Sequence, residues 1–281
     1  MRITISLIIL GIIVSLSNVS GQKVEKNSIS SLHTLSIHIK DPVIHDSVFH
    51  FFADRLKLPV YYNPLTLGER KYAGIFAGNL VLEPCGPYSN FKYATDNFKA
   101  IFFGLTFEPS LTISETSEFL LEQQILHDVV SDEFIYLKDP GLCSENITIS
   151  FMDKHEKVKD HLKIDSLRSV MRSGNSDPGI EYVKEIGIGF SSESNLQNWK
   201  KLISPSELSK GYSWKMNNMI DVQFSESKIK EVYEITFKVK SLKNARKYLS
   251  EQGLIGIDLK EEIILDQSKT FGLSIHLTEK N

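Results

Sequence analysis

Residues 32–42 read LHTLSIHIKDP, and this stretch decides the fold of the chain around it. Apolar and polar residues alternate over 32–40, which predicts a half-buried β-strand. Asp41 and Pro42 then supply a helix N-cap and a first-turn proline. Apolar residues follow at helical spacing as far as Leu58. A strand is therefore predicted to lead directly into a helix.

Three further apolar runs complete this first unit. They lie at 60–62, 71–77 and 80–83, and turns at Gly68 and at Gly78-Asn79 separate them. The predicted order of the unit is β-α-β-β-β.

The same order recurs three times along the chain. Strands are predicted at 100–107, 182–190 and 232–239, each followed closely by a helix; Thr112 with Glu115 forms a capping box, and Ser241 is an N-cap. The remaining strands are predicted at 126–130, 133–138, 146–152, 212–215, 219–224, 262–265 and 272–277. This repetition predicts an α+β fold built from four βαβββ units.

The units group into two predicted domains behind a leader. Arg2 precedes an uncharged apolar run at 3–17, which predicts a secretory signal peptide at 1–21 and an exported protein; an uncleaved membrane anchor is the alternative. Residues 30–153 and 180–279 each hold two units. Residues 154–179 are rich in Lys, Asp, Ser and Gly, and they predict a linker with a short helix near 161–171.

Composition excludes several classes of protein. The chain has 281 residues, of which 41% are hydrophobic and 24% charged, so it is neither disordered nor collagenous. The net charge of -3, from 32 basic and 35 acidic residues, gives no indication of a nucleic-acid-binding surface.

Cys85 and Cys143 are the two cysteines, and their spacing leaves open whether they form a disulfide. No membrane partner is expected after signal cleavage, and both a monomer and a homodimer remain possible.

The stretches HTLSIHIKDP, LPVYY, GERKYAGIFAGNLVLEPCGPY and IFFGLTFEP resemble the vicinal oxygen chelate superfamily, which includes glyoxalase I, bleomycin-resistance proteins and extradiol dioxygenases. VKEIGIGF, FKVKSLKNARKYLSEQGLIG and FGLSIHL resemble a second, more degenerate copy. The resemblance implies two glyoxalase-like domains. It also implies a divalent metal held by His or Glu near the start of a unit's first strand and by Glu on its fourth strand.

The first domain matches the family's pattern of metal ligands in part. Glu83 falls in the fourth-strand slot and is the candidate catalytic carboxylate and metal ligand. His38 shares a face with Thr34 and Ser36 by the period of a strand, and it is the second candidate ligand. The candidate substrate-binding residues are Ser36, Tyr61, Arg70 and Tyr72, since an Arg among tyrosines suits a carboxylate or phenolic ligand. The alternative is a solvated Arg beside half-buried tyrosines.

In the second domain the first-strand slots hold Glu185 and Glu234, and the last strand holds His276. The resemblance implies that these three form a facial site for Mn, Fe, Ni or Zn. The alternative is that they are ordinary polar residues, because a register slip of one residue would turn every side chain to the other face.

Three functions remain open on the sequence. The first is a metal-dependent lyase, isomerase or dioxygenase that acts on a small oxygenated molecule. The second is a metal-free protein that binds or sequesters a small molecule. The third is a scaffold in which the second domain serves only packing.

Overall fold

A computed structural model describes residues 28–87, 99–153, 158–173, 177–209 and 211–280. The predicted signal peptide at 1–21 lies outside these described residues. Among them, no helix is both long enough and apolar enough to span a membrane.

The first two units follow the predicted order. Unit one holds β1 (Ile29–Ile39), α1 (His45–His50), β2 (Val60–Leu67), β3 (Arg70–Phe76) and β4 (Val81–Gly86), with a 3-10 turn at Pro42–Ile44 and a π-helical turn at Phe51–Arg55. Unit two holds β5 (Ala100–Pro109), α2 (Ile113–Glu122), β6 (His127–Ser131), β7 (Phe134–Leu137) and β8 (Thr148–Met152).

Unit four also follows the predicted order, whereas unit three does not. Unit three holds β9 (Ile180–Phe190), α4 (Glu193–Ile203), β10 (Ser213–Lys215) and β11 (Asp221–Glu226), one strand fewer than the repeat. Unit four holds β12 (Glu231–Val239), α5 (Leu242–Glu251), β13 (Ile255–Asp258), β14 (Glu262–Leu265) and β15 (Ile275–Thr278). Between units two and three, α3 (Val158–Ser173) lies in the segment predicted as a linker with a short helix.

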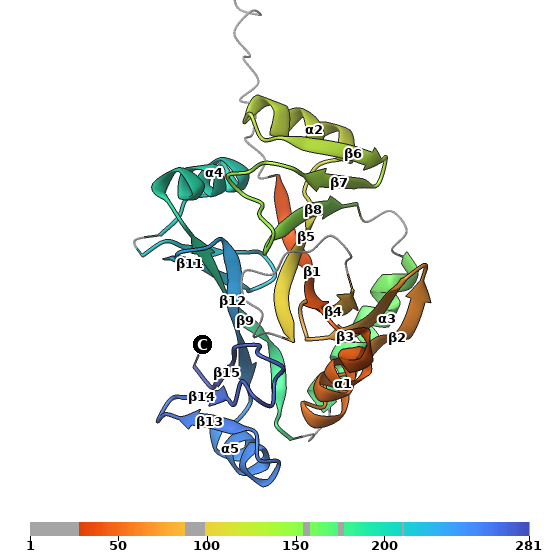
Figure 1. Cartoon of the computed structure of the whole chain (residues 1–281), viewed down its shortest axis with the longest axis vertical. Helices are drawn as coiled ribbons and strands as arrows, with labels where there is room; N and C mark the ends of the chain where they lie inside the picture. Colours follow the sequence, from red (N-terminus) through yellow and green to blue (C-terminus); the bar gives the residue numbers. More distant parts are fainter. Residues whose placement is uncertain (1–27, 88–98, 154–157, 174–176, 210, 281) are drawn as a thin grey trace, which may run out of the picture.

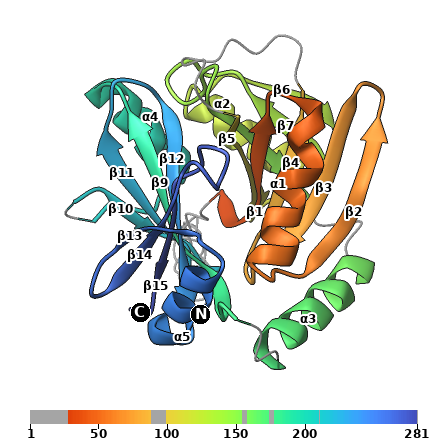
Figure 2. The ribbon, with the colours of Figure 1, turned by 60° about the horizontal axis from the view of Figure 1, so that its bottom comes forward.

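The first strand of one unit pairs with the first strand of the next, which joins unit one to unit two and unit three to unit four. β1 pairs with β5 antiparallel and β9 with β12 antiparallel. The remaining strands of each unit extend outward, giving the orders β2-β3-β4-β1-β5-β8-β7-β6 and β10-β11-β9-β12-β15-β14-β13. We call these the first and second sheets. A single pairing of Val232 with Phe102 joins them, and they lie on opposite sides of the molecule (Figures 1 and 2).

Local chemistry explains where the helices begin. Asp41 accepts a hydrogen bond from the Val43 amide, and Thr112 with Glu115 forms the predicted capping box of α2. Ser241 caps α5 in the same way, by accepting from the Asn244 amide.

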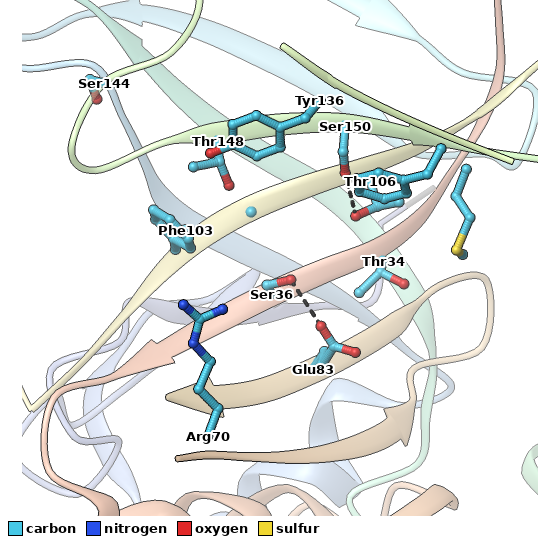
Figure 3. Close-up of a pocket in the computed structure, with 13 residues that line it drawn as sticks. Thr34, Ser36, Arg70, Glu83, Phe103, Thr106, Tyr136, Ser144, Thr148 and Ser150 are labelled. Carbon is cyan, nitrogen blue, oxygen red and sulfur yellow. Dashed lines mark hydrogen bonds between the residues drawn. The ribbon is translucent and has the colours of Figure 1, made fainter. Parts of the chain in front are cut away.

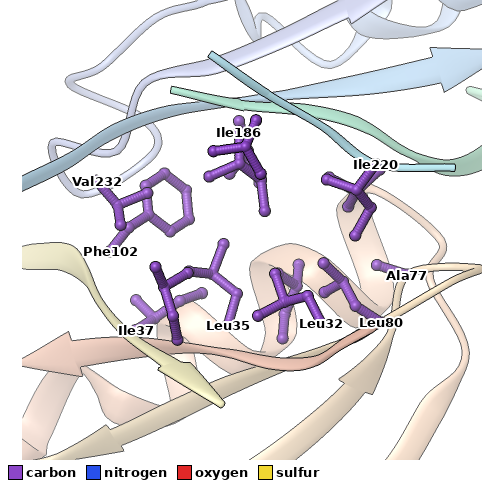
Figure 4. Packing of buried hydrophobic residues seen from close by; sticks show 14 of the residues in the cluster. Leu32, Leu35, Ile37, Ala77, Leu80, Phe102, Ile186, Ile220 and Val232 are labelled. Carbon is purple, nitrogen blue, oxygen red and sulfur yellow. The ribbon is translucent and has the colours of Figure 1, made fainter. Parts of the chain in front are cut away.

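The hydrophobic core lies where the two sheets meet. Leu32, Leu35 and Ile37 of β1 face Ile186 of β9 and Val232 of β12, and all five side chains are buried (Figure 4). Since successive residues of a strand alternate in direction, the polar residues between these apolar ones point to the opposite face of the first sheet. That opposite face carries the cavity described next.

Candidate functional site

A cavity of about 520 Å³ opens on the face of the first sheet opposite the hydrophobic core, which we call the inner face. Hydroxyl groups, aromatic rings, one carboxylate and one guanidinium group line it (Figure 3). The lining residues are Thr34, Ser36, Arg70, Glu83, Phe103, Gly104, Thr106, Phe134, Tyr136, Ser144, Thr148, Ser150 and Met152.

Strand register accounts for this lining. Ser36 is paired with Glu83 of β4 and with Gly104 of β5, and Gly104 is paired with Thr148 of β8. Paired residues share a face of the sheet, so a row runs across four strands. A second row holds Thr34, Thr106, Ser150 and Tyr136. Glu83 and Ser36 were candidate site residues on the sequence. Most of the lining residues that carry hydroxyl groups were not, because residues in a row across several strands have no regular spacing along the chain.

Glu83 is held by two hydroxyl groups. The Tyr62 hydroxyl donates to Oε1 at 2.6 Å, and the Ser36 hydroxyl donates to Oε2 at 3.3 Å. Burial raises the pKa of Glu83, and both hydrogen bonds oppose that rise. Burial and the Glu83 charge raise the pKa of Tyr62, so its phenol stays protonated. Among the described lining residues, Glu83 alone carries a carboxyl group that can exchange a proton with a ligand.

Arg70 reaches from the start of β3 toward Phe103 and Ser36 (Figure 3). It is therefore the lining residue that can meet an anionic group on a ligand. Tyr61 and Tyr72, the other predicted substrate-binding residues, are not among the lining residues described here. The Tyr61 ring instead lies 4.5 Å from Nζ of Lys163 on α3.

His38 lies beside this cavity without lining it. Its side chain is fully buried, and its ring lies 5.6 Å from the ring of Phe103, which does line the cavity. Burial, and then the nearby Arg70 charge, lower the pKa of His38 to about 4. His38 and Glu83 are therefore on adjacent strands but do not share the cavity surface.

On the second sheet, the three predicted residues come together with a fourth that the sequence did not reveal. Nε2 of His276 lies 3.4 Å from Oε2 of Glu234, and Nδ1 lies 3.0 Å from Oε1 of Glu262. Burial and the Glu234 charge raise the pKa of Glu185. Burial also raises the pKa of Glu234, against the effect of His276. The sequence did not predict Glu262 at this site, because only the antiparallel pairing of β14 with β15 brings it to His276.

The donor sets decide whether a metal ion fits. The first cavity offers one carboxylate among hydroxyls, where transition metals require several imidazole, thiolate or carboxylate ligands. On the second sheet, both imidazole nitrogens of His276 face carboxylates, which is the geometry of an ion pair. Within the described segments, no group of three or more His, Cys, Asp or Glu side chains is arranged to hold a metal ion. The described side chains therefore do not form a ready metal site.

The two cysteines do not form a disulfide. Cys85 is buried on β4, Cys143 is half-buried, and neither takes part in a disulfide. Burial raises the pKa of Cys143 to about 11, which disfavours its thiolate.

Comparison with known proteins finds likeness in structure alone. No family model matches the chain, and no curated protein matches its sequence. A variant of homoprotocatechuate 2,3-dioxygenase from Brevibacterium fuscum is 10% identical with a TM-score of 0.56, covering 91% of this chain and 72% of that one. The same enzyme in its anaerobic complex with 3,4-dihydroxyphenylacetate is 10% identical with a TM-score of 0.55, covering 91% and 82%.

An extradiol ring-cleaving dioxygenase from the same organism, studied at room temperature, gives a TM-score of 0.54 at 10% identity, covering 91% of this chain and 73% of that one. The fold is thus α+β, with paired modules arranged as in an extradiol dioxygenase. This agrees with the predicted likeness to vicinal oxygen chelate proteins. At such low identity it establishes the fold and not the reaction.

Proposed function

We propose that the chain binds a small hydroxylated organic acid in the cavity of the first sheet, through its own side chains and without a bridging metal ion. One observation carries the proposal. The inner-face row across β4, β1, β5 and β8 reads Glu83, Ser36, Gly104 and Thr148, which is one carboxylate among hydroxyls. Such a row suits hydrogen bonds to ligand hydroxyls rather than metal coordination.

The remaining lining residues define the ligand class. Phe103, Phe134 and Tyr136 provide aromatic surface for a planar ring. Arg70 supplies a guanidinium group that matches a ligand carboxylate in a bidentate pair. A cavity of about 520 Å³ falls within the usual range for small-molecule sites. The predicted signal peptide at 1–21 leads us to propose that binding takes place outside the cytoplasm.

The test uses 3,4-dihydroxyphenylacetate, the molecule bound in one of the structural neighbours, as a probe. Calorimetric titration in excess chelator is expected to show saturable binding, and phenylacetate, which lacks both hydroxyls, is expected to bind about tenfold more weakly. Glu83→Gln should weaken binding of the dihydroxy probe by a similar factor, because a charged acceptor is lost. Glu234→Gln removes a carboxylate from the second sheet and is the matched control.

Loss of binding in chelator would contradict the metal-free proposal. Loss in Glu234→Gln with retention in Glu83→Gln would move the ligand to the second sheet.

A metal-dependent enzyme of the lyase, isomerase or dioxygenase class is the second candidate function. The specific observation in its favour is that Glu234 and His276 meet, with Glu185 close enough for the Glu234 charge to raise its pKa. Elemental analysis of protein purified without chelator, before and after incubation with Mn, Fe, Ni or Zn, tests it. Near-stoichiometric metal that disappears in His276→Gln would support this candidate, and absence of metal under every condition would reject it.

A further inference from the structure

A second concave region lies between the two sheets, away from the cavity described above. Two cavities of about 470 and 440 Å³ adjoin there, and they share Asn79, Arg168, Asn217 and Asn218. We call this region the inter-sheet groove. Its walls come from α3, from the turn between β3 and β4, from the start of β9 and from the loop between β10 and β11, and in the smaller cavity also from β1 and the end of β5.

Hydrogen bonds between the sheets fix the floor of the groove. Asn79 Nδ2 donates to the Val183 carbonyl at 2.8 Å, and Asn79 Oδ1 accepts from the Val183 amide at 3.0 Å. Asn79 Nδ2 also lies 3.0 Å from the Asn218 carbonyl, to which it donates. The backbone approaches closely at Gly78, where a Cβ atom would lie 2.1 Å from the Glu181 carbonyl oxygen. The floor is therefore rigid before any ligand arrives.

Positive charge gathers on one wall. Arg168 and Arg172 are one helical turn apart on α3, so they project from the same face of the helix, and Lys240 lies beside them in the lining. Nζ of Lys240 donates to the carbonyls of Met171 and Arg172, each at 3.2 Å, which places its charge at the end of α3. Glu181 is the acidic residue of the larger cavity, and Glu108 is the acidic residue of the smaller one. Asp165 pairs with Arg168 only at 3.4 Å and from an exposed position. The lining of the groove thus holds three Lys or Arg side chains against two Glu side chains, an excess of one positive charge, and the three basic groups lie together at α3.

Asn218, which lines both cavities, carries a buried acceptor. Asn218 Nδ2 donates to the Leu32 carbonyl at 2.9 Å and to the Asn79 carbonyl at 3.2 Å. Those two bonds fix which way the amide points. Asn218 Oδ1 is buried and receives no hydrogen bond from any described protein group. A buried carbonyl oxygen left in this way costs about 1–3 kcal/mol, so it favours a ligand that donates to it.

We propose that the inter-sheet groove binds a small organic anion, a phosphate ester or a carboxylate, that also carries a hydroxyl group. Arg168 and Arg172 take the anionic end, since the guanidinium fork matches both phosphate and carboxylate. The ligand hydroxyl donates to Asn218 Oδ1. This site is separate from the Glu83 cavity and does not depend on the function proposed for it.

The experiment is calorimetric titration of the full chain at low ionic strength with four probes. Glycerol phosphate and glycerate carry both groups, whereas ethyl phosphate and propionate lack the hydroxyl. Saturable one-to-one binding is expected for at least one of the first pair, and its counterpart without the hydroxyl should bind about fivefold more weakly. Comparison of the first pair shows whether phosphate or carboxylate is preferred.

Variants locate the site. Arg168→Gln with Arg172→Gln is expected to weaken binding by about tenfold or more. Both residues are exposed, so the fold should survive, and the melting temperature checks this. Lys200→Gln with Lys201→Gln makes the same charge change on α4 and should leave Kd unchanged. Absence of saturable binding for all four probes would overturn the proposal. Equal weakening in the arginine and lysine pairs would also overturn it, because it would show attraction to net charge alone.

Discussion

Glu83 and His38 lie on neighbouring strands, and burial disfavours the charged form of both side chains. The pKa of Glu83 is raised and that of His38 is lowered, so each group has a greater tendency to be neutral in the folded protein than in the unfolded chain. Glu83 also faces the cavity, whereas His38 packs behind Phe103. The first residue thus bears on the proposed ligand binding, and the second bears on stability.

His38 makes stability depend on pH in a direction that can be checked. Its pKa is 6.5 ordinarily and about 4 in the folded protein, so below pH 6.5 the unfolded chain binds more protons. The free energy of unfolding should therefore fall as pH drops from about 6.5 to about 4, with a loss of about 2 kcal/mol between pH 7 and pH 5. Urea denaturation at these two values measures it.

His38→Gln should remove that part of the difference between pH 7 and pH 5, whatever it does to stability overall. His50→Gln is the control, because His50 is an exposed residue of α1. An unchanged pH dependence in His38→Gln would show that another group is responsible.

At the scale of elements, the local patterns gave reliable predictions of order. The strand predicted at 262–265 has the same bounds as β14, and the capping box at Thr112 is present. The strand β13 was missed, because Ile255–Asp258 is short and mostly exposed and so lacks an alternating pattern. Boundaries elsewhere moved by a few residues, since pairing with a neighbour extends a strand beyond its own apolar run.

Gly104 of β5 allows the proposed binding cavity to be tested. Gly104 lies between Ser36 and Thr148 in the inner-face row, and a Cβ atom there would lie 3.0 Å from Oγ of Ser36 and 3.3 Å from Oγ1 of Thr148. Gly104→Ala should therefore displace both hydroxyls by a few tenths of an ångström. We expect weaker binding of 3,4-dihydroxyphenylacetate with a melting temperature close to that of the parent chain.

Gly256→Ala provides the comparison, since this glycine also lies in a close approach, but in the second sheet. If Gly104→Ala bound the probe as well as the parent chain does, the row would not be the ligand's surface.

At the scale of the whole molecule, one turn couples the two sheets. Asn79 satisfies both backbone groups of Val183 and holds the loop at Asn218. Asn79→Ala would leave the Val183 amide and carbonyl without these partners, at a cost of about 2–4 kcal/mol. Urea unfolding followed by tryptophan fluorescence should report that loss, because Trp199 and Trp214 are both buried in the second half of the chain.

Asn217→Ala, at the exposed neighbouring position, should change the free energy of unfolding by less than about 0.5 kcal/mol. Equal stability of the two variants would mean that the apolar interface alone holds the sheets together.

The sequence by itself determined the four units, their order and their α+β class. Strand alternation, caps and turns depend on residues a few positions apart, and these can be read along the chain. Ser36 and Glu83 were both candidate site residues on the sequence, and the family resemblance grouped Glu234 with His276. The structure pairs Ser36 with Glu83 and brings Glu234 to His276.

Only the tertiary structure decided what surrounds those residues. The hydroxyl row, the burial of His38 behind Phe103 and the approach of Glu262 to His276 depend on register between strands far apart in sequence. The inter-sheet groove depends on how two sheets and α3 pack together. Neither register nor packing leaves a local spacing to read, because each is set by the free energy of the whole core.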